Sequence, residues 1–594
     1  MRELEYPFDG EYILKKAKSL KKMLLLDGTV RIKKRVAVLG GSTTHDIVRS
    51  LELFLLNYGI EPIFYESEYA MYWQDAMFDN PELVAFAPDI IIIHTSNRNI
   101  QSYPSLSDSK EQVEQLLYDC YRHFEVMWDK LRESYQCPII QNNFEYPFYR
   151  LLGNKEASDI HGRISFINRL NEMFYTYARE HDNFYINDIN YLSAQFGLDK
   201  WADPFYWHMY KYALSLSAIP TLSFSLSNIV KSIYGKNKKA LVLDLDNTLW
   251  GGIVGDDGVE NLEIGQETSI GQVYSEFQGY LKQQKEIGIM LNVCSKNELE
   301  NALAGLNHPD NVLKPEDFIV IKANWDPKSK NVAEIAHELN IARDSLVFVD
   351  DNPAEREIIK TQLPQVAVPE MISPEQYIKI IDHSGYFEVT SLSEDDKARN
   401  DMYKANMARK RQEENFGDYK EYLKSLNMTC QIKPFEPMYM ARIAQLTNKS
   451  NQFNLTTKRY TQAELEKISR NEEYITLYGK LEDRFGDNGV VTVAIGSIKQ
   501  ETLHMDLWLM SCRVLKRDME FAMMDTLVHT CKRAGISRIK GYYYPTAKNK
   551  MVENFYELQG FVKENSDEKG NTTWVYEIPE IYEKKNNIIK VEEK

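Results

Sequence analysis

Short apolar runs in the middle of the chain lead directly into residues whose side chains can do chemistry. The runs span residues 241–243, 289–293, 318–321 and 346–349, and helical patterns separate them. Such runs, alternating with helices, are typical of a parallel β-sheet covered on both faces. Because ligands of open α/β sheets bind just beyond the carboxyl ends of the strands, we expect a site where these runs end.

The first of these strand ends carries the pattern D-x-D-x-T, formed by Asp244, Asp246 and Thr248. A carboxylate such as Asp244 can attack phosphorus and form an aspartyl-phosphate, which divides one difficult displacement into two easier ones. A second acid two residues later can protonate the leaving oxygen and then activate water. Both steps need a divalent cation to offset the repulsion between carboxylates and phosphate, and oxygen ligands favour Mg²⁺.

The later strand ends supply the remaining groups of a phosphoryl-transfer site. Ser295 can donate a hydrogen bond to phosphoryl oxygens, and Lys328 can offset charge that builds up in the transition state. Lys330 is an alternative to Lys328 for that role. Asp350 and Asp351 form a pair of carboxylates that can hold a metal ion. An alternative role for any one of these acids is to cap the following helix.

The order of these residues resembles the haloacid dehalogenase superfamily of phosphotransferases over residues 239–375. The resemblance implies that Asp244 is the nucleophile and Asp246 the general acid and base. It also implies that the Asp244 side chain, the Asp246 carbonyl and Asp350 bind Mg²⁺, with Asp351 able to share that role. The expected phosphate-binding residues are Thr248, Ser295 and Lys328. The intervals between these motifs are too short for a large cap domain, so the site is either open or covered by other domains.

Longer strings are similar to the FkbH-like family, also called subfamily IIIC phosphatases, from about residue 35 to 565. These strings are Asp244–Gly255, Val293–Asn297, Val349–Arg356 and Leu446–Asn454. Relatives pass a phosphoglyceryl group to an acyl carrier protein, with a cysteine holding the glyceryl group. Cys294 would be that cysteine, with a pKa lowered by the metal site. The alternative is that Cys294 is an inert, packed side chain.

The N-terminal part resembles an SGNH-type hydrolase. The resemblance implies Ser42 as nucleophile, Asn142 or Asn143 as oxyanion donor, and Asp203 and His208 as partners in a triad. The sequence departs from that pattern, because Gly-Gly-Ser replaces Gly-Asp-Ser and the interval from the aspartate to the histidine is longer. A scaffold or carrier-docking role is therefore favoured over hydrolysis.

The C-terminal part resembles a GNAT acyltransferase, with Tyr556 at the general-acid position and Asn554 and Arg513 as further candidates. Residues 511–518 fall where a pyrophosphate loop belongs. That loop normally carries glycines, whose backbone N–H groups approach phosphate closely. Here Lys516 and Asp518 replace them, and the acid would repel phosphate. Binding of a coenzyme A thioester is therefore doubtful.

The chain has 594 residues, which is too long for one core. We expect an α/β multidomain fold in which a Rossmann-like central domain without a large cap is flanked by two others. The expected domains are SGNH-like (1–225), phosphatase-like (236–385), a helical connector (386–427) and a GNAT-like α+β domain (428–582).

The formal charge of −16 argues against a nucleic-acid partner. The sparse cysteines and the absence of an apolar leader or membrane segment predict a cytoplasmic protein. The function expected is Mg²⁺-dependent hydrolysis of a small phosphorylated metabolite, such as a sugar acid or glyceryl phosphate. The alternatives are a glyceryl or acyl transferase that loads an acyl carrier protein through Cys294, and an assembly scaffold with inactive flanking domains.

Overall fold

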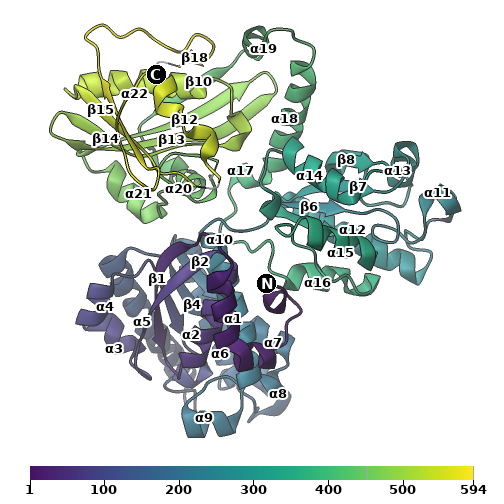
Figure 1. Ribbon diagram of the computed structural model, residues 1–594. Helices are drawn as coiled ribbons and strands as arrows, with labels where there is room; N and C mark the ends of the chain where they lie inside the picture. The colour runs from purple at the N-terminus through teal and green to yellow at the C-terminus, as the bar shows by residue number, and fades with distance from the viewer. Residues whose placement is uncertain (451, 547, 593–594) are drawn as a thin grey trace. The chain divides into compact units, whose positions relative to one another are not determined.

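The computed structural model describes residues 1–450, 452–546 and 548–592. Asn451, part of one string quoted above, therefore lies outside the described residues. The chain divides into two compact units, residues 1–236 and 237–594. Figure 1 shows three sheets with helices against them, formed by successive stretches of the chain. The α/β multidomain fold class expected from the sequence is confirmed. No helix among the described residues combines the length and apolar character needed to cross a membrane.

The first unit contains a five-stranded parallel sheet with the order β2-β1-β3-β4-β5. One face packs against α2 and α10, and the other against α5 and α6. The α1 helix packs outside α2 and α10. The strands are β1 (Ile32–Gly40), β2 (Ile60–Glu66), β3 (Ile90–His94), β4 (Ile139–Asn142) and β5 (Phe184–Asn187). The helices named are α1 (Gly10–Leu26), α2 (His45–Asn57), α5 (Lys110–Tyr135), α6 (Arg163–Glu180) and α10 (Ile219–Ile233).

Residues 237–385 form a four-stranded parallel sheet with the order β8-β7-β6-β9. The α12, α13 and α16 helices cover one face, and α14 and α15 cover the other. The strands are β6 (Ala240–Leu243), β7 (Met290–Ser295), β8 (Phe318–Ala323) and β9 (Leu346–Val349). The helices are α12 (Ser269–Glu286), α13 (Leu299–Leu306), α14 (Lys328–Glu338), α15 (Pro353–Gln362) and α16 (Tyr377–His383). These four strands lie where the apolar runs predicted them.

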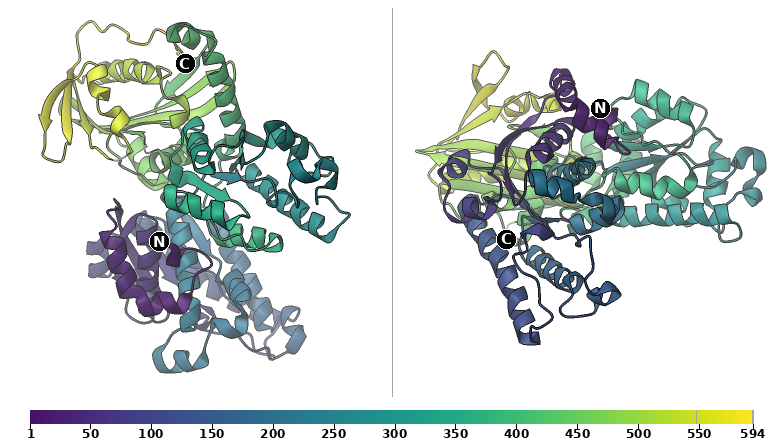
Figure 2. Two further views of the ribbon diagram at one scale, coloured as in Figure 1. Left: turned by 45° about the vertical axis from the view of Figure 1, so that its right-hand side comes forward. Right: turned by 90° about the horizontal axis from the view of Figure 1, so that it is seen from below.

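The remainder of the second unit is a helical segment followed by a mixed nine-stranded sheet (Figure 2). The α22 helix packs on one face, and α20 and α21 pack on the other. The strands are β10 (Thr429–Lys433), β11 (Phe453–Asn454), β12 (Tyr474–Asp483), β13 (Gly486–Lys499), β14 (Thr502–Met510), β15 (Arg538–Tyr543), β16 (Val562–Ser566), β17 (Thr572–Glu577) and β18 (Lys590–Val591). The helices are α17 (Glu394–Lys397), α18 (Arg399–Glu413), α19 (Tyr419–Ser425), α20 (Met440–Lys449), α21 (Gln462–Ser469), α22 (Met519–Arg533) and α23 (Phe555–Leu558).

A buried ion-pair cluster fastens α18 to this sheet. The side chain of Asp483, at the end of β12, is fully buried and lies 2.6 Å from Arg409 of α18. Its second oxygen lies 3.1 Å from Arg517, which precedes α22. One carboxylate therefore compensates two guanidinium groups that are both almost completely buried.

We expect Asp483→Asn to lower the free energy of unfolding by about 3–5 kcal/mol, because it leaves buried guanidinium charge uncompensated. Chemical denaturation of the full chain measures this change. The matched control is Asp487→Asn, which breaks the more exposed 2.7 Å pair with Lys480 and is expected to change stability by less than about 1 kcal/mol. Equal effects of the two variants would contradict the interpretation.

Candidate active site

In the central sheet the carboxyl ends of β6, β7 and β9 lie side by side. Leu243, the last residue of β6, pairs with Val293 of β7 and Val349 of β9. The next residue, Asp244, donates its backbone N–H to the Val349 carbonyl at 2.9 Å. The residues that follow these strands are therefore gathered where ligands of parallel sheets bind.

Lys328 lies between two of the carboxylates. Its Nζ is 2.9 Å from Asp244 Oδ2 and 2.6 Å from Asp350 Oδ2, and its side chain is 4% exposed. Burial acts to lower the pKa of Lys328, but the charges of Asp244 and Asp350 outweigh it and raise that pKa above its usual range. Lys330 instead pairs with Asp326 at the surface. The structure thus brings Lys328, and not Lys330, to the carboxylates.

Asp244, Asp350 and Asp351 form a cluster that can bind a metal ion. Each offers one carboxylate oxygen, and these oxygens lie within 4.8 Å of one another. Asp244 Oδ1 is buried and has no hydrogen-bond partner among the residues that the structure describes. Burial and the charge of Asp244 raise the pKa of Asp350 to about 6, and burial also raises the pKa of Asp351. An all-oxygen donor set with an unsatisfied buried oxygen fits Mg²⁺.

Asp246 is held by donors from three sides. Its Oδ1 accepts hydrogen bonds from the Trp250 indole and from the backbone N–H of Val254, both at 3.0 Å. Its Oδ2 accepts one from the Asn297 amide at 3.1 Å. Burial raises the pKa of Asp246, and the charge of Asp244 contributes. A fixed carboxylic acid with a raised pKa suits general acid catalysis.

Thr248 and Ser295 lie at the same edge. The Thr248 hydroxyl accepts the backbone N–H of Asp351 at 3.2 Å and lies 3.5 Å from that residue's carboxylate. Ser295 ends β7 and is 1% exposed. Both predicted phosphate-binding hydroxyls are therefore built into the strand ends that carry the carboxylates.

Sequence reasoning did not assign roles to several residues that hold the site in shape. Arg356 is buried in α15 and donates from Nη1 to the carbonyls of Asp350 (2.9 Å) and Asp351 (2.7 Å). Asn297 and Trp250 position Asp246, as described above. The sequence did point to these residues, because all three lie inside the strings that resemble the FkbH-like family.

No cap domain is inserted among residues 237–385, all of which the structure describes. The segment between β6 and α12 contains only the short helix α11 (Val254–Asp257) and one 3₁₀ turn, Val259–Asn261. The interval between β7 and α14 contains α13 and β8. The expectation of a central domain without a large cap agrees with this arrangement.

The structure does not favour the expected role of Cys294. Its side chain is completely buried and belongs to the core formed by β6, β7 and α14. Its thiol points to the Lys328 carbonyl at 3.8 Å. Burial raises the pKa of Cys294 to about 12, opposite to the lowered value expected for a nucleophilic thiolate. The structure therefore favours the alternative that Cys294 is an inert, packed side chain.

The N-terminal candidates do not assemble into the expected triad. Asp203 caps the helix α9 (Pro204–Tyr210) by accepting the Phe205 N–H at 2.8 Å, while His208 is exposed. Both N–H groups of the Asn142 amide are engaged, with His94 at 2.8 Å and the Thr95 carbonyl at 3.3 Å. Neither an aspartate–histidine pair nor a free oxyanion donor forms at these positions.

The alternative donor, Asn143, is also engaged, with Tyr175 and Asp188 at 2.7 Å each. Ser42 is buried, and its hydroxyl has no partner among the described residues. Asn99 lies beside the turn that carries Ser42, and its side-chain amide donates to the Gly41 carbonyl at 3.0 Å. A Cβ at Gly41 would lie 2.3 Å from the Asn99 amide nitrogen, so a larger residue there would displace the Asn99 side chain.

The C-terminal candidates are also dispersed. Tyr556 is 1% exposed, with its ring packed on Gly541, and burial raises its pKa above the usual range. Asn554 is exposed beside it. Arg513 turns to Asp395, at 3.5 Å. Tyr556 is therefore enclosed in the core, and Arg513 is engaged by a carboxylate.

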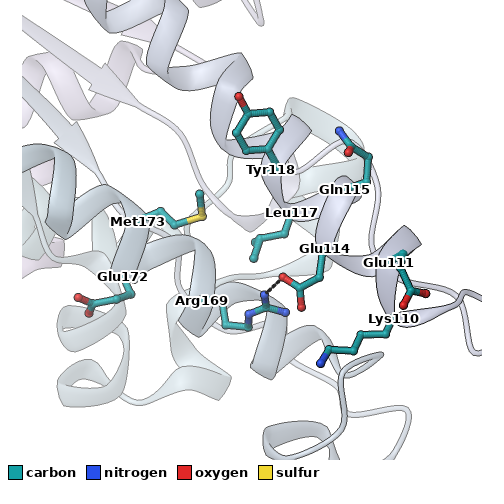
Figure 3. Close-up of a pocket in the computed structure, with 9 residues that line it drawn as sticks. All are labelled: Lys110, Glu111, Glu114, Gln115, Leu117, Tyr118, Arg169, Glu172 and Met173. Atoms are coloured by element: carbon teal, nitrogen blue, oxygen red, sulfur yellow. Dashed lines mark hydrogen bonds and ion pairs between the residues drawn. The ribbon is translucent and has the colours of Figure 1, made fainter.

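A hollow of about 860 Å³ lies between α5 and α6 in the first unit (Figure 3). Glu114 and Arg169 form an ion pair across it. It contains none of the predicted site residues. The residues that line it are Lys110, Glu111, Glu114, Gln115, Leu117, Tyr118, Arg169, Glu172 and Met173.

We expect Mg²⁺ to stabilise the protein against unfolding, by about 2.7 kcal/mol at a concentration one hundred times its Kd. Thermal denaturation with and without Mg²⁺ measures this effect. Asp350→Asn and Asp351→Asn should lose it, because each removes a carboxylate of the cluster. Asp326→Asn is the control, because that acid is exposed and paired with Lys330. Undiminished stabilisation of both cluster variants would contradict the assignment.

We also expect stabilisation by Mg²⁺ to weaken as the pH falls through about 6. The pKa of Asp350 in the metal-free protein is raised to about 6, so below that pH a proton competes with the cation for the carboxylate. A titration of Mg²⁺ at several pH values measures the apparent Kd. An affinity unchanged from pH 7.5 to pH 5 would contradict this prediction.

Comparison with known proteins places the chain in a family. The family profile described as "FkbH, N-terminal domain" matches residues 35–231. The N-terminal part of BF1531 from Bacteroides fragilis, described as containing a phosphatase domain complexed with Mg, is 31% identical, with a TM-score of 0.59. That match covers 63% of this chain and 99% of the BF1531 structure.

Two acetyltransferases match smaller parts of the chain. They are the ribosomal-protein-S18-alanine N-acetyltransferase from Escherichia coli (12% identity, TM-score 0.21) and Ard1 from Thermoplasma volcanium (20% identity, TM-score 0.20). Each match covers 26% of this chain, and 97% and 99% of the respective structures. A search of curated protein sequences gave no match. From the profile match and the coverage of BF1531, the chain belongs to the FkbH-like family.

Proposed function

We propose that residues 237–385 catalyse the Mg²⁺-dependent transfer of a phosphoryl group from a small phosphorylated metabolite to Asp244, and then to water. The observation that carries this proposal is the environment of the Asp244 carboxylate. One of its oxygens is neutralised by Lys328 at 2.9 Å. The other is buried, has no hydrogen-bond partner within the described part of the chain, and lies beside the carboxylates of Asp350 and Asp351. An oxygen in that position is placed to bind a cation or to attack phosphorus.

Two steps account for the reaction. In the first, an Asp244 oxygen attacks phosphorus, the bond from phosphorus to the substrate oxygen breaks, and Asp246 donates a proton to that oxygen. In the second, Asp246 takes a proton from water, the water oxygen attacks phosphorus, and the aspartyl-phosphate bond breaks. Phosphate leaves, and Asp244 and Asp246 return to their starting states.

The other residues of the site support the charge changes in these steps. In this proposal Lys328 offsets the negative charge of the transferring group, and the hydroxyls of Thr248 and Ser295 donate to its oxygens when substrate is bound. Mg²⁺ bound by Asp244, the Asp246 carbonyl and the Asp350–Asp351 pair supplies electrostatic stabilisation of the phosphoryl oxygens. The phosphatase domain of BF1531, described as complexed with Mg, supports this assignment.

The substrate class follows from the resemblance to FkbH-like proteins and from the absence of a cap in this domain. A sugar acid phosphate or a glyceryl phosphate is the class that we propose. A site without a cap in its own domain is also compatible with a phosphate ester on an acyl carrier protein, which is the partner that the resemblance implies. Transfer of a glyceryl or acyl group through Cys294 has less support, because that thiol is buried and burial raises its pKa to about 12.

The test is phosphate release with Mg²⁺ over a panel of phosphorylated sugar acids, glyceryl phosphates and a carrier-bound ester. We expect Asp244→Asn to reduce kcat on the active substrate by on the order of 10⁴-fold. Cys294→Ala is the matched control, since it changes a buried residue of the same strand ends and should retain most of the activity. Equal activity of Asp244→Asn and the unmodified protein would exclude Asp244 as nucleophile, and loss of activity in Cys294→Ala alone would favour the transferase.

A further inference from the structure

The C-terminal sheet contains a split between two parallel strands. One edge of β14 pairs with β13 along its length, from Thr502 to Met510. The other edge pairs with β15 only over Thr502–His504. Beyond that point β14 and β15 diverge toward their carboxyl ends, which is where an α/β structure normally receives a ligand. A coenzyme A thioester, the cofactor that a GNAT-like fold implies, would need this opening for its amide-containing arm.

A segment of the chain itself lies in the split. Residues 453–456, which we call the inserted segment, form β11 and the two residues after it. Phe453 and Asn454 pair with Met510 and Leu509 of β14. Leu455 donates its N–H to the Trp508 carbonyl at 3.1 Å, and the Thr456 hydroxyl donates to the Asp506 carbonyl at 2.7 Å. The free edge of β14 is therefore already hydrogen-bonded.

The inserted segment is also bonded to the other side of the split. The Leu455 carbonyl accepts the N–H of Tyr544, which follows β15, at 2.9 Å. The amide of Asn549 donates to the carbonyls of both Asn454 and Tyr544 at 2.9 Å. Asn549 is completely buried, and each residue of the inserted segment is at most 6% exposed. The segment thus bridges the two strands and fills the space between them.

The loop of residues 511–518, where pyrophosphate would bind, is held by contacts with other parts of the chain. Lys516 and Asp518 have left-handed backbone conformations, with φ of 65° and 61°. Asp518 occupies the N-cap of α22, so a carboxylate stands where the helix N-terminus would attract phosphate. Arg517 is bound to Asp483, and the Lys516 carbonyl accepts the Tyr419 hydroxyl of α19 at 2.7 Å.

The same loop and its surroundings contact the phosphatase-like residues within the second unit. Asn340 donates to the Cys512 carbonyl at 3.0 Å, and Lys548 lies 2.5 Å from Asp344. Arg513 pairs with Asp395 of α17. Two cations near the loop, Arg513 and Lys548, which could attract a pyrophosphate, are therefore paired with carboxylates of neighbouring elements of the same unit.

We propose that the inserted segment occupies the acyl-CoA position of the C-terminal domain. The domain therefore binds no coenzyme A, and its 511–518 loop instead serves as the joint to the connector and the phosphatase-like residues. Coenzyme A does not fit the residues present. This inference does not depend on the reaction catalysed at Asp244.

Isothermal titration of the full chain with coenzyme A and with acetyl-coenzyme A tests the first part. We expect no saturable heat and no change in Tm. The double variant Lys516→Gly/Asp518→Gly restores the glycines of a phosphate loop and should still bind neither compound, because the split remains filled. Saturable binding to the unmodified chain, or to this variant, would overturn the proposal.

Hydrogen exchange tests whether the segment stays in place. The amides of Leu455 and Tyr544 should exchange slowly, at the same rate with and without coenzyme A. Asn549→Ala removes the two side-chain bonds at the bridge and should speed exchange of these amides by about tenfold. The control Asn565→Ala changes an exposed residue of β16 and should leave their exchange unchanged. Rapid exchange in the unmodified chain that coenzyme A slows would show that the segment yields to the cofactor, and the proposal would fail.

Discussion

The buried ammonium of Lys328 is the interaction on which the arrangement of the central site depends. Three carboxylates with oxygens within 4.8 Å of one another repel strongly in a site shielded from water. Lys328 contacts two of them directly. Three negative charges then face one positive charge, and the excess of two matches one divalent cation. Burial and the charge of Asp244 raise the pKa of Asp350, as expected for a carboxylate in excess of its compensating charge.

The strand ends of the central sheet could be predicted because their physical signal is local. Each strand there is buried on both faces and reads as a short apolar run, and the first polar residue after the run marks the sheet edge. The parallel register then brings Asp244, Ser295 and Asp350 to one edge without further information. The sequence left open whether Lys328 or Lys330 joins them. Both lie in the first turn of α14, and only the direction of each side chain decides which one reaches the carboxylates.

Other features lacked a local signal. The β2 strand is an edge strand that is only partly buried, so residues 60–66 do not read as an apolar run. The inserted segment has two residues of strand and depends on partners about fifty and ninety residues away. Cys294 and Ser295 are adjacent in sequence, yet alternation along β7 puts the thiol in the core. The triad around Ser42 was expected from the SGNH resemblance, but the Asp203 side chain caps α9 instead.

The absence of an inserted cap in the domain that carries Asp244 has a kinetic consequence for the proposed aspartyl-phosphate. An aspartyl-phosphate in a sealed pocket meets only the water trapped with it, and hydrolysis is its one outcome. In a pocket that its own domain leaves open, the acceptor is whichever hydroxyl reaches the phosphorus first. On the proposed mechanism, hydrolysis and phosphoryl transfer to another hydroxyl are then two outcomes of one intermediate, set by which acceptor reaches it and not by any difference in the carboxylates.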